Sequence, residues 1–217
     1  MCSRYSETRD APRLMSRFRA DVDRDLFEPR FNIAPGTSAP VVYLKDGKRW
    51  LAGFRFGLAF PSGDLAGPIN ARAESLWQKP FFARLVKAQR CLVVADSFYE
   101  WSGPKGKKRP SRFALKSGEP FAFAGLWDNS RFAIITTTPN ALVAPIHDRM
   151  PAMLAAGDED LWLDAGVSES GPLSNVLRPF DVGLMERFDV STFVNRATAE
   201  GPECWSAPQA DSQLALF

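Results

Sequence analysis

Cys2 directly follows the initiator methionine, and methionine is removed when a small residue such as cysteine comes next. The new terminus would carry an α-amine and a thiol on one carbon skeleton. Their reference pKa values are about 7.7 to 8.0 and about 8.5, so we expect both to have reactive, deprotonated fractions near neutral pH. Such an aminothiol condenses with aldehydes, because the amine forms an imine and the thiolate then closes a thiazolidine ring. Alone, Cys2 could equally be an ordinary second residue.

Glu100 could move protons during that condensation. It lies between aromatic residues in FYEW at 98 to 101, directly after a predicted apolar strand. Loss of solvent there would raise the pKa of its carboxyl toward neutrality, which suits a group that carries protons to and from a carbinolamine. The alternative is a solvated charge at the end of a strand.

His147 is the only histidine, and it stands between two prolines in PIHDRMP at 145 to 151. Prolines restrict the backbone, and histidine is the usual proton shuttle near neutral pH. We expect Asp148 or Arg149 to orient the ring or to bind a phosphate. A lone histidine can also be purely structural.

Two further segments carry polar groups. In INARAES at 69 to 75, Asn70 could orient an amine or hydroxyl and Arg72 could bind a phosphate, although the segment could also be a helix start. The basic run SGPKGKKRP at 102 to 110 is typical of a solvated hairpin tip, and it could also lie along a nucleic-acid backbone.

The composition predicts one globular domain. The chain has 217 residues, of which 45% are hydrophobic, and its net charge of +2 is too small to identify a nucleic-acid partner. We expect a domain at 1 to 205 and a mobile tail at 206 to 217. Three scattered cysteines predict neither disulfides nor a zinc site, and no apolar run has signal-peptide or membrane-span length. A cytoplasmic monomer with no membrane partner is expected.

Apolar periodicity and turn residues predict an α+β fold. Thr8 can cap a helix whose apolar face is Ala11, Leu14, Met15 and Phe18, and Asp46-Gly47 predicts a hairpin turn. Other expected helices are 80 to 89, 158 to 164 and 171 to 178, and expected strands are 39 to 45, 49 to 56, 91 to 96, 112 to 116, 120 to 127, 131 to 137 and 182 to 190. This pattern favours a curled, largely antiparallel, barrel-like β-sheet flanked by a few short helices.

Five motifs in a fixed order carry a family resemblance. They are MCSRY at 1 to 5, FNIAPGT at 31 to 37, INARAE at 69 to 74, ADSFYEW at 95 to 101 and IHDRMP at 146 to 151. Together they resemble the SRAP family, the SOS-response-associated peptidase-like proteins, over about residues 1 to 200. VNRA at 194 to 197 is similar to a late Val-Asn motif of that family.

The resemblance implies a covalent response to DNA damage. Cys2 would crosslink to the aldehyde of an abasic site in single-stranded DNA, Asn70 would position its amine, Glu100 would transfer protons, and His147 would assist Schiff-base chemistry and adduct reversal. The implied DNA contacts are Arg4, Asn32, Pro35, Phe60, Arg72, Thr136 and Arg149. Of these, Thr136 would face His147. No metal or cofactor is implied, and the implied partners are abasic single-stranded DNA and replication machinery.

Two departures from the family pattern stand out. Ser3 replaces the glycine that usually follows the cysteine. GLAFPSG at 57 to 63 lacks the tryptophan that stacks on DNA, so Phe60 is the expected substitute.

Two other functions remain open. One is an N-terminal cysteine peptidase, a hydrolase that acts on its own Met1 or on peptides. The other is a non-enzymatic single-strand binder that uses aromatic residues and the basic loop, with Cys2 incidental. A lyase-like side reaction is compatible with the crosslinking hypothesis.

Overall fold

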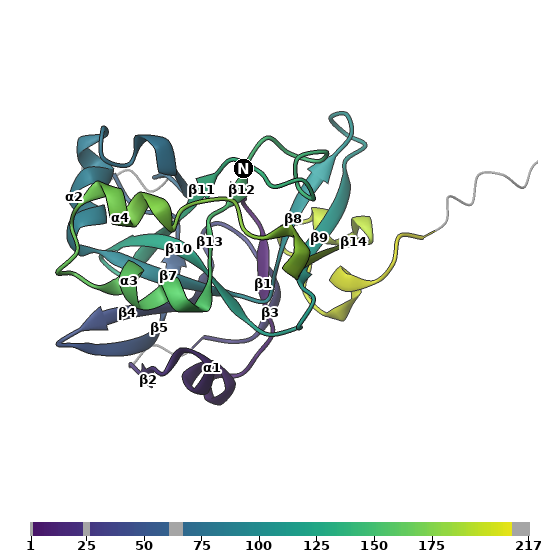
Figure 1. Ribbon diagram of the computed structural model, residues 1–217. Helices are drawn as coiled ribbons and strands as arrows, with labels where there is room; N and C mark the ends of the chain where they lie inside the picture. The colour runs from purple at the N-terminus through teal and green to yellow at the C-terminus, as the bar shows by residue number, and fades with distance from the viewer. Residues whose placement is uncertain (1, 24–26, 61–66, 210–217) are drawn as a thin grey trace, which may run out of the picture.

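A computed structural model describes residues 2–23, 27–60 and 67–209 (Figure 1). Within these ranges the chain forms a ring of strands with short helices around it, and its last described segment leaves on one side. Of the expected tail, residues 206–209 are exposed, and 210–217 lie outside the described residues.

The ring is a sheet that closes on itself. Its neighbours run in the order β11-β10-β7-β4-β5, and β11 also pairs in parallel with β5. The five strands are β4 (Ser38–Lys45), β5 (Lys48–Phe56), β7 (Arg90–Ala95), β10 (Phe121–Asp128) and β11 (Arg131–Thr137). Short strands extend it, namely β2 (Asp21–Val22), β6 (Asn70–Arg72), β12 (Met150–Pro151) and β13 (Met153–Leu154). The predicted curled, largely antiparallel sheet is confirmed.

The predicted hairpin joins β4 to β5. Asp46 and Gly47 both have positive φ, at 52° and 73°, as a tight two-residue hairpin turn requires.

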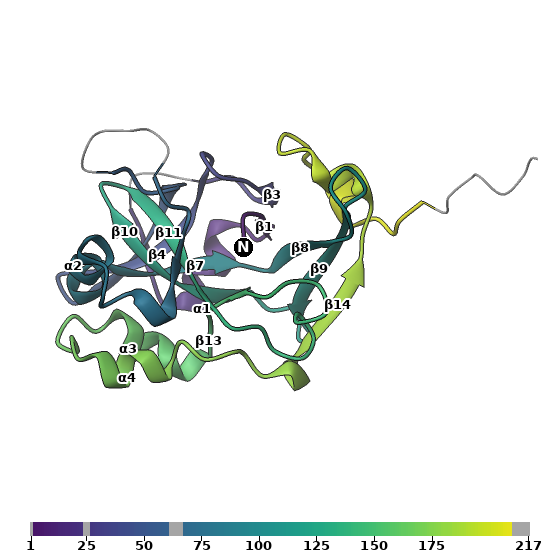
Figure 2. The same cartoon turned by 90° about the horizontal axis from the view of Figure 1, so that it is seen from above.

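A second sheet stands against the ring and has the order β14-β9-β8-β1-β3. Its strands are β1 (Tyr5–Glu7), β3 (Arg30–Ile33), β8 (Ser97–Ser102), β9 (Arg109–Leu115) and β14 (Met185–Asp189). In Figure 2 the ring strands lie on one side of β1, and β8, β9 and β14 lie on the other.

This second sheet corrects the predicted place of Glu100. The sequence put Glu100 just beyond the end of a strand, and that is wrong. The chain leaves β7 at Ala95 and enters β8 at Ser97, so Glu100 lies inside a strand and pairs with Ser111 of β9.

Short helices cover the outside of the ring. They are α1 (Ala11–Phe18), α2 (Pro80–Ala88), α3 (Glu159–Leu163) and α4 (Ser170–Asn175), with 3-10 turns η1 (Ala73–Ser75) and η2 (Ala156–Asp158). The later 3-10 turns lie by the second sheet, where η3 (Val182–Leu184) precedes β14, η4 (Thr192–Asn195) contacts β9 and η5 (Pro202–Trp205) contacts β3. The strand expected at 182 to 190 begins later than predicted, because its first three residues form η3 and only Met185–Asp189 form β14. No helix in the described ranges is long and apolar enough to cross a membrane.

The N-cap of α1 differs from the prediction. Asp10, not Thr8, accepts the Arg13 N–H, at 3.1 Å. Thr8 instead donates its hydroxyl and its backbone N–H to the Asp96 carboxylate, at 2.6 and 2.9 Å. Asp10 directly precedes the first helical residue, Ala11, so its carboxylate is placed to accept a free N–H of the first turn. Thr8 lies two residues further back, where its hydroxyl serves as a donor to Asp96.

β7 separates two apolar cores, because both of its faces are buried. Leu92 and Val94 pack outward with Trp162 of α3, while Cys91, Val93 and Ala95 pack into the ring. Cys2 belongs to this inner core.

Gly125 of β10 offers a test of the packing inside the ring. A Cβ added there would come within 2.6 Å of Val93 Cγ2 and 2.9 Å of Cys91 Sγ. We expect Gly125→Ala to lower the free energy of unfolding by about 1–3 kcal/mol, measured by denaturant titration, because a packed core has no room for an added methyl. Gly157→Ala is the matched control, since no atom lies within 4 Å of its added Cβ. Equal stability of the two variants would contradict this packing.

Candidate active site

The pairing of β1 with β8 positions the N-terminal arm. Tyr5 pairs with Phe98 and Ser6 with Ser97, and the Tyr99 N–H donates to the Arg4 carbonyl at 3.0 Å. Continued by two residues, this antiparallel register places Ser3 opposite Glu100. The arm that carries Cys2 is thus fixed beside the strand that carries Glu100.

Cys2 is completely buried, and Asn70 contacts it. The Asn70 side-chain amide, at the start of β6, donates to the Cys2 carbonyl at 3.0 Å. The amide was expected to position the amine of Cys2, and in the structure it holds the carbonyl of the same residue. The Asn70 Oδ1 is buried and has no hydrogen-bond partner among the described residues.

Burial changes the chemistry of the Cys2 thiol. Desolvation raises the pKa of the thiol well above its ordinary value, and the negative charge of Glu100 raises it further. The expected thiolate fraction near neutral pH is therefore wrong for this structure, because the apolar surroundings disfavour the anion. The thiol is neutral, and its reaction requires a base to accept the proton.

Glu100 has the properties of such a base. It is buried within β8, and desolvation raises the pKa of its carboxyl to about 7, with the Asp148 carboxylate acting in the same direction. The predicted upward shift is confirmed. A carboxyl with this pKa both gives and accepts protons near neutral pH.

His147 lies next to Glu100, with 4.0 Å between its Nε2 and Glu100 Oε2. The Arg149 backbone N–H donates to His147 Nδ1 at 3.0 Å, which places the proton of a neutral ring on Nε2, facing Glu100. Asp148 Oδ1 lies 2.9 Å from the same Nδ1. This carboxylate attracts a proton on Nδ1, and therefore stabilises the imidazolium form of the ring. Burial lowers the pKa of His147. Both neighbours thus orient the ring, as the sequence predicted.

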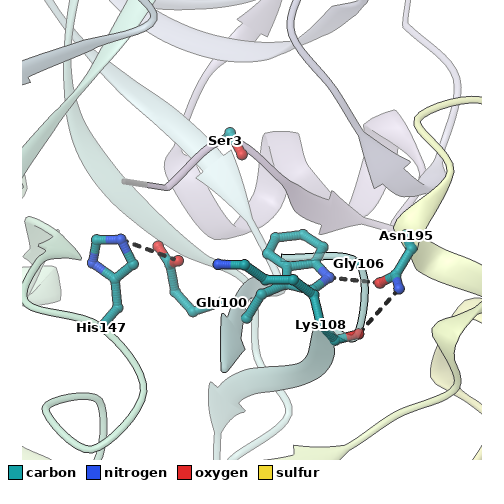
Figure 3. A pocket seen from close by; sticks show the side chains of 7 residues that line it. Ser3, Glu100, Gly106, Lys108, His147 and Asn195 are labelled. Atoms are coloured by element: carbon teal, nitrogen blue, oxygen red, sulfur yellow. Dashed lines mark hydrogen bonds and ion pairs between the residues drawn. The ribbon is translucent and has the colours of Figure 1, made fainter. Parts of the chain in front are cut away.

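A cavity of about 430 Å³ opens over these groups (Figure 3). It is lined by Ser3, Glu100, Trp101, Gly106, Lys108, His147 and Asn195. Lys108 belongs to the basic run at 102 to 110, for which the sequence left a solvated hairpin tip and a nucleic-acid contact open. Trp101 and Asn195 were not singled out as site residues from the sequence. Trp101 stands in FYEW and Asn195 in VNRA, so the motifs contained a signal for both.

Arg4 and Asn32 hold the arm to η4 and the residues after it. Arg4 donates to Asn32 Oδ1 at 2.7 Å, to the Val194 carbonyl at 3.1 Å and to the Asn195 carbonyl at 3.0 Å. Asn32 is buried and donates to the carbonyls of Arg196 and Ala199. In the structure these two expected DNA contacts bind the protein itself.

Arg149 and Thr136 also have partners within the protein. The Arg149 guanidinium forms a bidentate ion pair with the Glu74 carboxylate, with N–O distances of 2.7 and 2.9 Å. It also donates to the Thr136 carbonyl at 2.5 Å. Thr136 is fully buried, and its hydroxyl lies 3.5 Å from the Ala71 carbonyl.

The three remaining expected DNA contacts are exposed and do not line the cavity. Pro35 follows β3, Arg72 ends β6, and Phe60 is 44% exposed, with its ring 6.1 Å from that of Phe81 in α2. Residues 61–63 of the expected stacking segment lie outside the described residues.

The cysteines are unpaired. Across residues 2–23, 27–60 and 67–209, no group of three or more His, Cys, Asp and Glu side chains could hold a metal ion.

Comparison with known proteins identifies relatives of this chain. It is 35% identical to the abasic site processing protein YoqW of Bacillus subtilis, over 94% of this chain and 98% of that protein. It is 30% identical to the abasic site processing protein HMCES of Xenopus tropicalis, over 86% of this chain and 68% of that protein. A crystal structure of a Bacteroides thetaiotaomicron protein, 22% identical, matches 95% of this chain and 99% of its own with a TM-score of 0.80, so the fold is shared. The family model for SOS response associated peptidase (SRAP) matches residues 1–197, and the chain belongs to this family.

Proposed function

We propose that this protein captures abasic sites in single-stranded DNA by forming a covalent thiazolidine with Cys2 after Met1 is removed. The observation that carries the proposal is the meeting of four groups from distant segments. Asn70 holds the Cys2 carbonyl at 3.0 Å, the register of β1 against β8 brings the arm that carries Cys2 beside Glu100, and His147 lies 4.0 Å from Glu100. The relatives named abasic site processing proteins support the choice of substrate.

The reaction joins one aldehyde and one aminothiol with loss of one water. The Cys2 amine adds to the aldehyde carbon of the ring-opened sugar and gives a carbinolamine. The Glu100 carboxyl, with a pKa of about 7, protonates the departing hydroxyl, and an imine forms as water leaves.

Ring closure then forms the bond between Sγ and the former aldehyde carbon. Because the buried thiol is neutral, its proton must move as that bond forms. Loss of water leaves the imine protonated and Glu100 ionised. The Glu100 carboxylate accepts the thiol proton, and the nitrogen keeps the proton that it already carries and becomes the ring amine. The neutral His147, with its Nε2 toward Glu100, can relay protons between the carboxyl and solvent.

Removal of Met1 is essential to this scheme, because an amide nitrogen is not a nucleophile. The protein should therefore attach to an oligonucleotide that contains an abasic site, and should not attach to one that carries an ordinary base. The adduct is measured as a shifted band that survives heating in denaturant. Cys2→Ala and protein that retains Met1 should give no such band.

The same assay separates the two alternative functions. A single-strand binder would show equal, salt-sensitive binding with Cys2→Ala and no denaturation-resistant band. A peptidase would hydrolyse peptides, or release Met1, in the absence of DNA. If lesion-bearing DNA never becomes attached to protein whose Met1 is shown by mass spectrometry to be absent, the proposal fails.

Glu100 should set the pH dependence of crosslinking. If the ionised carboxyl accepts the thiol proton, the rate rises as pH increases through about 7, where Glu100 loses its own proton. Glu100→Gln should lower the rate by about 100-fold, the usual size of general acid–base effects, and should remove the part of the rise centred near 7. The rise that comes from loss of the proton of the Cys2 amine, whose reference pKa is about 7.7 to 8.0, should remain. Time courses on denaturing gels, at pH values on both sides of 7, measure both effects.

Asp148→Asn is the matched variant for this pH dependence. It keeps Glu100 and removes a carboxylate that raises its pKa, so the midpoint of the rise should move to lower pH. An unchanged profile in Glu100→Gln would show that another group moves the proton.

A further inference from the structure

Lys108 lines the same cavity as Glu100 and His147, and the proposed chemistry does not use it. It comes from the loop between β8 and β9, and Figure 3 shows its side chain extended from the hairpin toward Glu100. Among the described residues that line the cavity, it is the one with a lysine or arginine side chain.

The backbone of Lys108 is held in place. The Asn195 side chain donates to the Lys108 carbonyl at 3.2 Å, and the same side chain accepts the Trp101 indole N–H at 2.6 Å. Lys108 also directly precedes Arg109, which pairs with Ser102 at the end of the hairpin ladder. The exposed Lys105 and Lys107 belong to the same loop and do not line the cavity.

Charge determines what this ammonium can bind. An abasic sugar in a strand is joined to phosphodiesters, each with a negative charge. The Glu100 carboxylate lines the cavity, and the Asp148 carboxylate lies 2.9 Å from the Nδ1 of His147, which also lines it. Both carboxylates repel such a ligand when they are ionised. Lys108 supplies the opposite charge, and lysine is a common phosphate ligand in proteins.

We propose that the Lys108 ammonium binds the phosphodiester next to the abasic sugar and thereby positions the aldehyde against Cys2. This proposal rests on the proposed function and adds a substrate-binding group to it. The phosphate is identified by its chemistry alone, as a singly charged oxyanion joined to the reacting sugar.

The electrostatics of the cavity agree with this role. The charge of Lys108 lowers the pKa of both Glu100 and His147, so the ammonium acts on both groups at the reaction centre. A bound phosphate would offset that charge. Glu100 would then hold its proton more tightly, as the dehydration step requires of an acid.

The test compares a substrate that has phosphates with one that lacks them. Lys108→Met is reacted with an abasic oligonucleotide, followed on denaturing gels, and with free 2-deoxyribose, followed by the intact mass of the protein. Each protein is assayed at its own pH optimum, because removal of the Lys108 charge shifts the pKa of Glu100. We expect a loss in rate on the order of tenfold with the oligonucleotide and a much smaller loss with the free sugar. The dependence on salt should also weaken, with a slope smaller by about 0.7, the value for one phosphate contact on a single strand.

Two further variants complete the test. Lys107→Met removes the same charge from the same loop outside the cavity and should react like the unmodified protein. Lys108→Arg keeps the charge and should restore most of the rate with DNA.

Three results would overturn the proposal. An unchanged rate of Lys108→Met with abasic DNA would show that the ammonium makes no useful contact. An equal loss with free 2-deoxyribose would assign Lys108 a structural role or an effect on Glu100. An equal loss in Lys107→Met would indicate general attraction by the loop. Failure of the unmodified protein to crosslink DNA would instead refute the proposed function itself.

Discussion

The site depends on one backbone constraint, the antiparallel pairing of β1 with β8. Cys2 lies in a short arm, and an arm of this kind is usually poorly ordered unless a sheet ties it down. Here the Tyr5 to Phe98 register and the bond from the Tyr99 N–H to the Arg4 carbonyl fix that arm. Because β8 also carries Glu100, one set of backbone hydrogen bonds holds the arm that carries Cys2 beside the strand that carries Glu100.

The same pairing removes both groups from water, and that burial decides their reactivity. Cys2 lies in the inner core of the ring, where its thiol stays neutral, while desolvation brings the pKa of Glu100 to about 7. Because the thiolate is the reactive form of cysteine, a neutral thiol reacts slowly with electrophiles in general. In the proposed reaction its activation depends on the ionisation of one nearby carboxyl, Glu100, whereas an exposed thiol can be activated by its own low pKa.

Sequence patterns located the elements whose signals are local. The Asp46-Gly47 turn, the helix that begins at Pro80 and the apolar strand β7 follow from short-range rules, and the structure has all three. β1 and β3 have no such signal, since YSE and RFNI mix polar and apolar residues over three or four positions. Tertiary pairing alone makes them strands. For the same reason FYEW did not show that Glu100 lies within a strand.

Among the site residues, the sequence predicted the raised pKa of Glu100 from its aromatic neighbours, and the structure agrees. His147 was singled out as the only histidine, and its ring lies 4.0 Å from Glu100. The roles of these residues in the reaction stay predictions. The contacts of Arg4 could not be predicted, because its partners at Val194 and Asn195 lie about 190 positions away along the chain.

Those contacts show why η4 matters to the site although it belongs to neither sheet. The Asn195 carbonyl accepts a hydrogen bond from Arg4, and so helps to hold the arm that carries Cys2. The Asn195 side chain bonds to Trp101 and to the Lys108 carbonyl, and so holds the opposite wall of the cavity. One residue near the end of the fold thereby fixes the arm that carries Cys2 and the basic hairpin relative to each other. The shape of the cavity therefore depends on a segment about 190 positions from the N-terminal arm, and not on that arm alone.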